Sequence, residues 1–278
     1  MNDILPTLKK SVVLIIAGFG VGILLALLYS LGSILYNSST NLSISQLRIS
    51  LLIGELMLPF PILLWAYRNK LDMQSIFRLN PVRKELILPV LISGLCLVIL
   101  IDELDRILAH FVSMPDNFQE IQALMEIDSI TSGIIIIGII VVLGPFIEEI
   151  VFRGFFQRVL EQRLSNVTHA VLISAFTFAV LHFNPWWLIQ IYILGFVMAF
   201  FAYRTGSIVL PLIVHALNNG ISVIASQFDG QNLPGYLWHG HVNPLIIILS
   251  VYFTYWSIKK LIRLTGSKSH NQHNSDWA

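Results

Sequence analysis

Long apolar runs constrain this chain more than any other feature of its sequence. Of its 278 residues, 55% are hydrophobic and only 12% are charged, and the mean hydropathy is +0.75. Soluble domains are about 25% charged, whereas a helix that crosses ~30 Å of hydrocarbon needs about 20 apolar residues. We therefore expect an all-α, polytopic membrane bundle of about eight transmembrane helices, in the windows 12–36, 47–67, 86–101, 131–159, 168–183, 186–203, 207–226 and 242–262.

The basic residues predict the orientation of this bundle. Successive connections between the windows lie on alternate sides of the membrane. On this basis, every Lys and Arg except Arg48 and Arg106 lies on the same side. Because cytoplasmic loops carry an excess of Lys and Arg, both termini are expected to be cytoplasmic. The net charge of +1 leaves no basic patch for nucleic acid, and the single cysteine, Cys96, excludes an intrachain disulfide.

The chain contains no low-complexity linker and no obvious internal repeat, so we expect one structural domain. Residues 1–130 hold the amino-terminal helices and an acidic outer loop. Residues 131–226 form a helical core with the candidate site residues. Residues 227–278 hold the last helix and a polar cytoplasmic tail.

Three charged residues interrupt the apolar segment GPFIEEIVFRG, namely Glu148, Glu149 and Arg153. Charges at bilayer depth are costly unless they are paired or wetted, so they usually mark a functional site. On a helix, Glu149 and Arg153 are four apart and form a pair, while Glu148 points about 100° away from Glu149. Glu148 is then available as a general base. The alternative is that all three residues form one structural ion cluster.

Two later windows place histidine on helical faces. Phe178 and His182 are four residues apart, as are His215 and Asn219. A carboxylate, two imidazoles and an amide can activate water and stabilise an oxyanion during amide hydrolysis. The alternative is that each histidine is a satisfied core residue that joins two helices. Counting inward from the cytoplasmic helix ends places His182 several residues deeper than Glu148 and His215.

The ordered patterns EExxxR, FxxxH and HxxxN resemble the CAAX prenyl protease and bacteriocin-processing family of intramembrane glutamic endopeptidases, which includes the type II CAAX prenyl endopeptidases. The resemblance covers residues 131–226. It implies that Glu148 and His182 activate water, that His215 and Asn219 form an oxyanion hole, and that Glu149 and Arg153 support the site.

The resemblance also implies a cellular setting and a class of substrate. We expect a multi-pass protein of a bacterial plasma membrane whose active site is accessible from the cytoplasm. It would need no cofactor and no nucleic acid. Its substrates would be prenylated CAAX-type peptides, leader peptides, bacteriocin precursors or membrane-protein segments.

Two alternative functions stay open at the level of sequence. In the first, the protease depends on zinc, with His182, His215 and Glu148 as ligands. The chain has no HExxH motif, however, and Asn219 would then have no clear role. In the second, the protein is a non-catalytic immunity, assembly or transport factor that uses its buried polar groups for binding or proton coupling.

Overall fold

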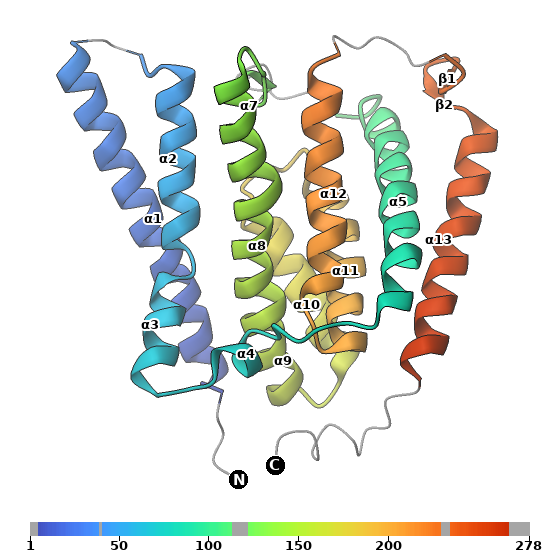
Figure 1. Cartoon of the computed structure of the whole chain (residues 1–278), viewed down its shortest axis with the longest axis horizontal. Coiled ribbons are helices and arrows are strands. Elements are labelled where there is room, and N and C mark those ends of the chain that lie inside the picture. The colour runs from blue at the N-terminus through green and yellow to red at the C-terminus, as the bar shows by residue number, and fades with distance from the viewer. Residues whose placement is uncertain (1–4, 39–40, 113–121, 229–233, 267–278) are drawn as a thin grey trace.

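The computed structural model describes residues 5–38, 41–112, 122–228 and 234–266 and is almost wholly helical in these ranges (Figure 1). The all-α prediction is confirmed. A two-stranded antiparallel hairpin precedes the last helix. The elements are α1 (Leu8–Asn37), α2 (Ile44–Met57), α3 (Phe60–Arg68), α4 (Met73–Ile76), η1 (Lys84–Leu86), α5 (Ile87–Leu108), α7 (Ile130–Ile136), η2 (Ile137–Leu143), α8 (Gly144–Glu149), η3 (Ile150–Phe156), α9 (Gln157–Arg163), α10 (Val167–Val180), α11 (Leu188–Thr205), α12 (Val209–Ser226), β1 (Leu237–Trp238), β2 (His241–Val242) and α13 (Pro244–Thr265).

Seven helical segments within the described ranges are long and apolar enough to cross a membrane. They are Leu8–Asn37, Ile44–Arg68, Lys84–Leu108, Ile130–Arg163, Leu188–Thr205, Val209–Ser226 and Pro244–Thr265. The chain is therefore a multi-pass integral membrane protein, as predicted.

The remaining predicted window, 168–183, corresponds to α10. This helix has only 14 residues, which is about 21 Å at 1.5 Å per residue and is shorter than the hydrocarbon thickness. Eight crossings and cytoplasmic termini stay predictions. The start of α1 and the end of α13 do lie on the same side of the bundle (Figure 1).

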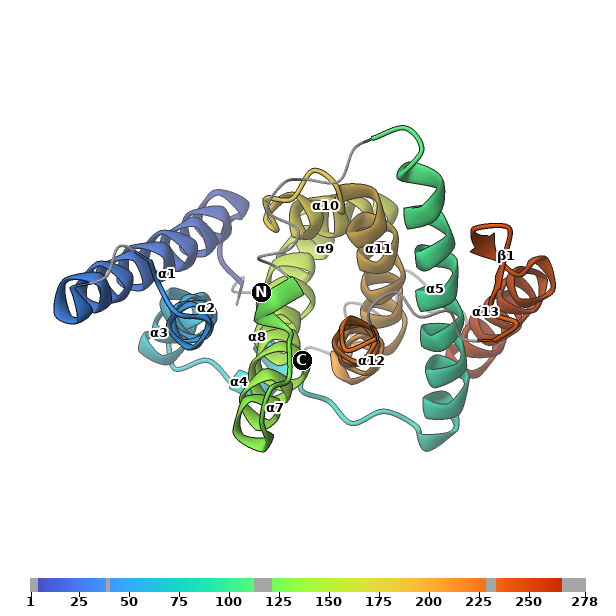
Figure 2. The ribbon, with the colours of Figure 1, turned by 90° about the horizontal axis from the view of Figure 1, so that it is seen from above.

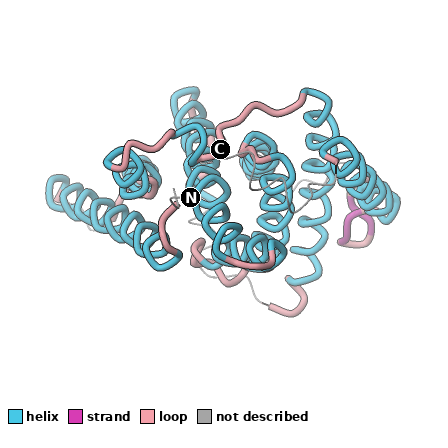
Figure 3. The backbone as a smooth tube through the Cα atoms, turned by 90° about the horizontal axis from the view of Figure 1, so that it is seen from below, coloured by secondary structure: helices cyan, strands magenta, loops and turns pink. Residues whose placement is uncertain are grey.

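The helices that carry the sequence motifs lie in the middle of the bundle. Seen from above and from below, α8 to α12 are flanked by α1 to α3 on one side and by α5 and α13 on the other (Figures 2 and 3). Fully buried large side chains gather on these middle helices, among them Phe152, Phe155, Phe178, Met198 and Phe201. The outer helices α1 and α13 instead expose many apolar side chains, which suits helices that face lipid.

The continuous helical segment Ile130–Arg163, from α7 to α9, is the central helix, and the short helix α4 holds one of its ends. Arg78, which follows α4, forms a buried ion pair with Glu161 of α9, and Arg158 donates to a backbone carbonyl of α4. Gly154 allows this close approach, because a Cβ atom there would lie 2.7 Å from the carbonyl oxygen of Phe77. The central helix is therefore fixed in position at the end formed by α9.

The division into residues 1–130, 131–226 and 227–278 stays a prediction. Parts of the predicted acidic loop (113–121) and polar tail (267–278) lie outside the described residues.

Candidate active site

A fully buried ion pair lies at the centre of the site. The Nη1 atom of Arg153 donates to Oε1 of Glu149 at 2.8 Å, and both side chains are 0% exposed. The guanidinium also donates to the carbonyl of Gly195 on α11 at 3.3 Å, and its carbon lies 4.0 Å from the ring centre of Phe178 on α10. The predicted pairing of Glu149 with Arg153 is thus present, and it joins three helices.

Glu149 also connects this ion pair to His215 on α12. The same Oε1 atom that binds Arg153 lies 2.9 Å from Nδ1 of His215, whose side chain is 5% exposed. A buried carboxylate with two donors is better satisfied than one with a single partner. Glu149 and Arg153 therefore fix the position and orientation of the His215 ring.

Glu148 points to a different set of neighbours, as its position on the helix predicts. Its Oε2 atom lies 3.8 Å from Nε2 of His182 and 3.7 Å from Nε2 of His215. Both separations exceed a direct hydrogen bond, and Oε2 has no hydrogen-bond partner among the described residues. Separations just beyond 3.5 Å suit groups that one water molecule bridges.

The hydrogen bonds on the far side of each ring determine which nitrogen faces Glu148. Nδ1 of His182 lies 2.7 Å from the carbonyl oxygen of Phe178, and Nδ1 of His215 faces the Glu149 carboxylate. A carbonyl and an ionised carboxylate only accept, so each Nδ1 atom carries a proton. In the neutral rings, both Nε2 lone pairs are then directed to the side where Glu148 lies.

His182 lies at the level of Glu148, so the predicted difference in depth is wrong. The α9 helix ends at Arg163, and α10 begins at Val167. Glu148 precedes Arg163 by the same number of residues as His182 follows Val167, so the two side chains lie at equal depth. The α10 helix also ends before it could cross the bundle, and His182 lies in the turn that follows it. This short helix brings the imidazole to the carboxylate.

Asn219 lies one helical turn beyond His215 and makes a contact of its own. The central helix has wide turns before Pro145, where the amide of Gly144 bonds to the carbonyl of Ile139, five residues back. The next donor in that pattern is Pro145, which has no amide hydrogen, so the carbonyl of Ile140 lacks a partner within the helix. Asn219 supplies the missing donor, since its Nδ2 atom donates to the carbonyl oxygen of Ile140 at 2.9 Å.

The structure thus brings Glu148, His182 and His215 together and places Glu149 and Arg153 behind them. No hydrogen bond or ion pair within the described residues joins Asn219 to these five. Glu55, a carboxylate on α2, was not predicted as a site residue, although α2 packs against α8. Its signal was an acidic residue inside the apolar window 47–67.

The described residues contain no group of three or more His, Cys, Asp and Glu side chains that could hold a metal ion. Oε2 of Glu148 lies 3.8 Å from Nε2 of His182 and 3.7 Å from Nε2 of His215. Two histidines and a glutamate are a known zinc ligand set, and metal-bound histidines usually donate their second nitrogen to a carbonyl or carboxylate, as both rings do here.

The fold and the site together define an integral membrane protein with a buried cluster of Glu, His and Arg between its central helices. Residues 130–221 match the family model described as type II CAAX prenyl endopeptidase Rce1-like. This segment contains all seven motif residues that carried the resemblance, so the predicted resemblance is confirmed over it.

Two curated proteins of Bacillus subtilis (strain 168) are similar to the chain. It is 34% identical over 122 residues to the "Uncharacterized protein YyaK", which covers 40% of each chain. It is 33% identical over 103 residues to the "Putative membrane peptidase YdiL", which covers 37% of this chain and 41% of that protein. The matches thus span about two fifths of the length of these relatives. No solved structure matches the chain.

Proposed function

We propose that the chain is an intramembrane endopeptidase that hydrolyses peptide bonds with a water molecule activated by Glu148 and His182. The observation that carries the proposal is the position of Oε2 of Glu148, which lies 3.8 Å and 3.7 Å from the Nε2 atoms of two histidines. The match to an endopeptidase family model and the printed name of the peptidase relative support the same class of reaction.

In this mechanism Glu148 takes a proton from the water as the water oxygen attacks the carbonyl carbon of the substrate. His182 accepts a hydrogen bond from the same water through Nε2 and orients it. The C–N bond then breaks, and the proton held by Glu148 passes to the leaving nitrogen. No covalent bond to the protein forms, which agrees with the lack of a serine or cysteine nucleophile motif beside these histidines.

His215 and Asn219 are proposed to stabilise the oxyanion. An amide has two N–H donors, so Asn219 keeps one after its bond to Ile140. His215 donates from Nε2 when both of its ring nitrogens carry a proton, and its Nδ1 atom then donates to the Glu149 carboxylate. Glu149 and Arg153 therefore act by positioning His215 and by compensating its charge.

The proposed substrates are peptide segments that reach the site from the bilayer or along it. The family resemblance favours prenylated CAAX-type peptides, leader peptides, bacteriocin precursors and membrane-protein segments. A site that lies within the membrane and opens to the cytoplasmic side of a bacterial plasma membrane suits all of them.

The proposal is tested by comparing membrane proteomes of cells that carry wild-type protein or Glu148→Gln at equal abundance. This change keeps the size and hydrogen bonding of the side chain and removes the base. Peptides cut only in wild-type cells are the expected result. Identical peptides and an unchanged cellular phenotype would favour a non-catalytic immunity, assembly or transport role.

A zinc-dependent hydrolase is a second candidate. It is favoured by the convergence of one carboxylate oxygen and two Nε2 atoms whose rings are held from behind. Metal analysis of the purified protein, with activity measured before and after chelation, separates it from the metal-free mechanism. Zinc at one equivalent, with activity that chelation removes and zinc restores, would establish the second candidate.

A further inference from the structure

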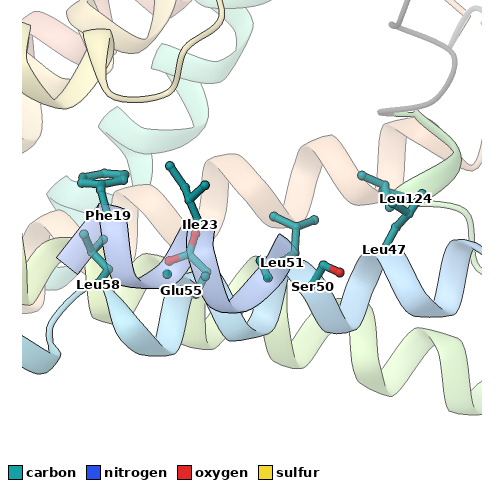
Figure 4. A pocket seen from close by; sticks show the side chains of 11 residues that line it. Phe19, Ile23, Leu47, Ser50, Leu51, Glu55, Leu58 and Leu124 are labelled. Carbon is teal, nitrogen blue, oxygen red and sulfur yellow. The ribbon is translucent and has the colours of Figure 1, made fainter. Parts of the chain in front are cut away.

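A cavity of about 370 Å³ lies between α1 and α2, beside Leu124 (Figure 4). Its size falls within the range of about 300–1,000 Å³ for sites that hold small ligands. The lining is almost entirely apolar, with Phe19 and Leu58 at one end and Leu47 and Leu124 at the other. The cavity therefore suits an apolar occupant at bilayer depth.

Glu55 is the one carboxylate among the residues that line this cavity, and Figure 4 shows its side chain next to Ile23. Its Oε2 atom is buried and has no hydrogen-bond partner among the described residues. The other polar side chain in the lining, Ser50, is satisfied, since its hydroxyl donates to the carbonyl of Gln46. A buried acceptor without a partner is costly, so Glu55 fits a donor supplied by a ligand.

One end of the cavity lies against the candidate active site. The ring of Phe19 contacts the ring of Phe183 edge to face, with centroids 6.4 Å apart, and Phe183 directly follows His182. The helix that carries Glu55, α2, also packs against α8, which carries Glu148. An occupant of the cavity thus approaches the carboxylate that we propose as the base.

The unpaired acceptor decides between a helical and an extended occupant. The backbone N–H groups of a helix are already paired within the helix, so a helical segment brings no free backbone donor to Glu55. An extended backbone brings N–H groups that need acceptors inside the membrane.

We propose that this cavity binds, in extended form, an apolar segment of the substrate on one side of the bond to be cut, and that Glu55 accepts a backbone N–H group of that segment. The inference rests on the proposed endopeptidase function. The free backbone N–H group of the peptide would donate to the free Oε2 atom of Glu55. Glu55 is then a specificity-determining residue.

The test uses the full-length protein with Glu148→Gln, so that binding is measured without hydrolysis. The probes are fluorescent nonapeptides of Val, Leu and Phe, with each backbone nitrogen methylated in turn, and the readout is fluorescence anisotropy in nanodiscs. Methylation at one position should weaken binding by about 10-fold, the value of one hydrogen bond. Adding Glu55→Leu should weaken binding of the unmethylated peptide by a similar factor. Methylation at that position should then have no further effect on binding.

Two further variants control the test. Glu55→Gln keeps an acceptor oxygen, so peptide binding to this variant should still depend on methylation of that backbone nitrogen. If Glu55 had only a structural role, its replacement would not change this dependence. Ser50→Ala removes a polar group that is already satisfied and should behave like the parent protein. Failure of every peptide to bind, or equal sensitivity to methylation with and without Glu55→Leu, would overturn the proposal. Displacement of the peptide by oleate without any dependence on methylation would instead identify the cavity as a lipid site.

Failure of this inference can be told apart from failure of the proposed function. If the otherwise wild-type protein cleaves the peptides and Glu55→Leu leaves KM unchanged, the inference fails and the endopeptidase stands. If binding depends on Glu55 but wild-type protein cleaves no peptide, the cavity stands as a binding site and the proposed hydrolysis fails.

Discussion

Replacing Arg153 with Met removes the positive charge from a pair in which both side chains are 0% exposed. The guanidinium loses its bond to Glu149 at 2.8 Å and its contact with the Phe178 ring at 4.0 Å. Glu149 is left with His215 as its donor. Breaking a buried pair in this way costs about 3–5 kcal/mol, which lowers the midpoint of thermal unfolding by roughly 6–20 °C.

The reactivity of a single cysteine provides an assay for this prediction. Cys96 is the only cysteine, and it is buried in α5. A dye that fluoresces on reaction with thiols therefore reports unfolding of the detergent-solubilised protein as it is heated. Arg153→Met should become reactive at a clearly lower temperature than wild type.

The double variant Glu149→Gln/Arg153→Met tests the reason for the effect. It removes both charges, keeps an acceptor for His215 and fills the space beside Phe178 with an apolar side chain, so most of the lost stability should return. Arg83→Met is the matched control. Arg83 is exposed, pairs with Glu85 at 3.6 Å and donates to the carbonyl of Leu264 at 2.9 Å, so its loss should cost only about 1 kcal/mol. If Arg153→Met unfolds at the same temperature as wild type, or if the double variant is no more stable than Arg153→Met, the buried ion pair does not stabilise the bundle as stated.

Three other predictions concern the oxyanion, the helix packing and the metal. His215→Ala and Asn219→Ala should each lower kcat by about 10²–10³-fold in a peptide-cleavage assay, and unchanged rates in both would remove their role as oxyanion donors. Gly154→Ala should destabilise the bundle by about 1–3 kcal/mol, because its Cβ would meet the carbonyl oxygen of Phe77 at 2.7 Å. Gly138→Ala, which meets nothing within 4 Å, should be neutral or slightly stabilising in the same thermal assay. Exhaustive chelation should leave the rate of peptide cleavage unchanged. If chelation abolished cleavage and added zinc restored it, the zinc-dependent mechanism would replace the metal-free one.

Helical spacing predicted the part of the site that depends on one helix at a time. The pairing of Glu149 with Arg153 and the separate direction of Glu148 both follow from positions on a single helix, and both are present. The relative depth of His182 did not follow, because it depends on the length of α10, which ends at Val180. Apolar windows do not reveal such a helix end.

Other contacts depend on backbone details that residue patterns do not contain. The bond from Asn219 to Ile140 exists because Pro145 follows wide helical turns and leaves a carbonyl without a donor. The cavity beside Glu55 depends on how α1 and α2 pack, which is controlled by close approaches such as that of Gly22 to Gly54. A single acidic residue in the window 47–67 was visible, but its neighbours were not.

In the proposed mechanism, Glu148 removes a proton from water held beside His182. The decisive measurement is the kcat of purified Glu148→Gln on a peptide that wild-type protein cleaves, with thermal stability measured in parallel. We expect kcat to fall by about 10²–10⁴-fold, the usual contribution of a general base, at an unchanged midpoint of unfolding. Cleavage at the wild-type rate by this folded variant would contradict it.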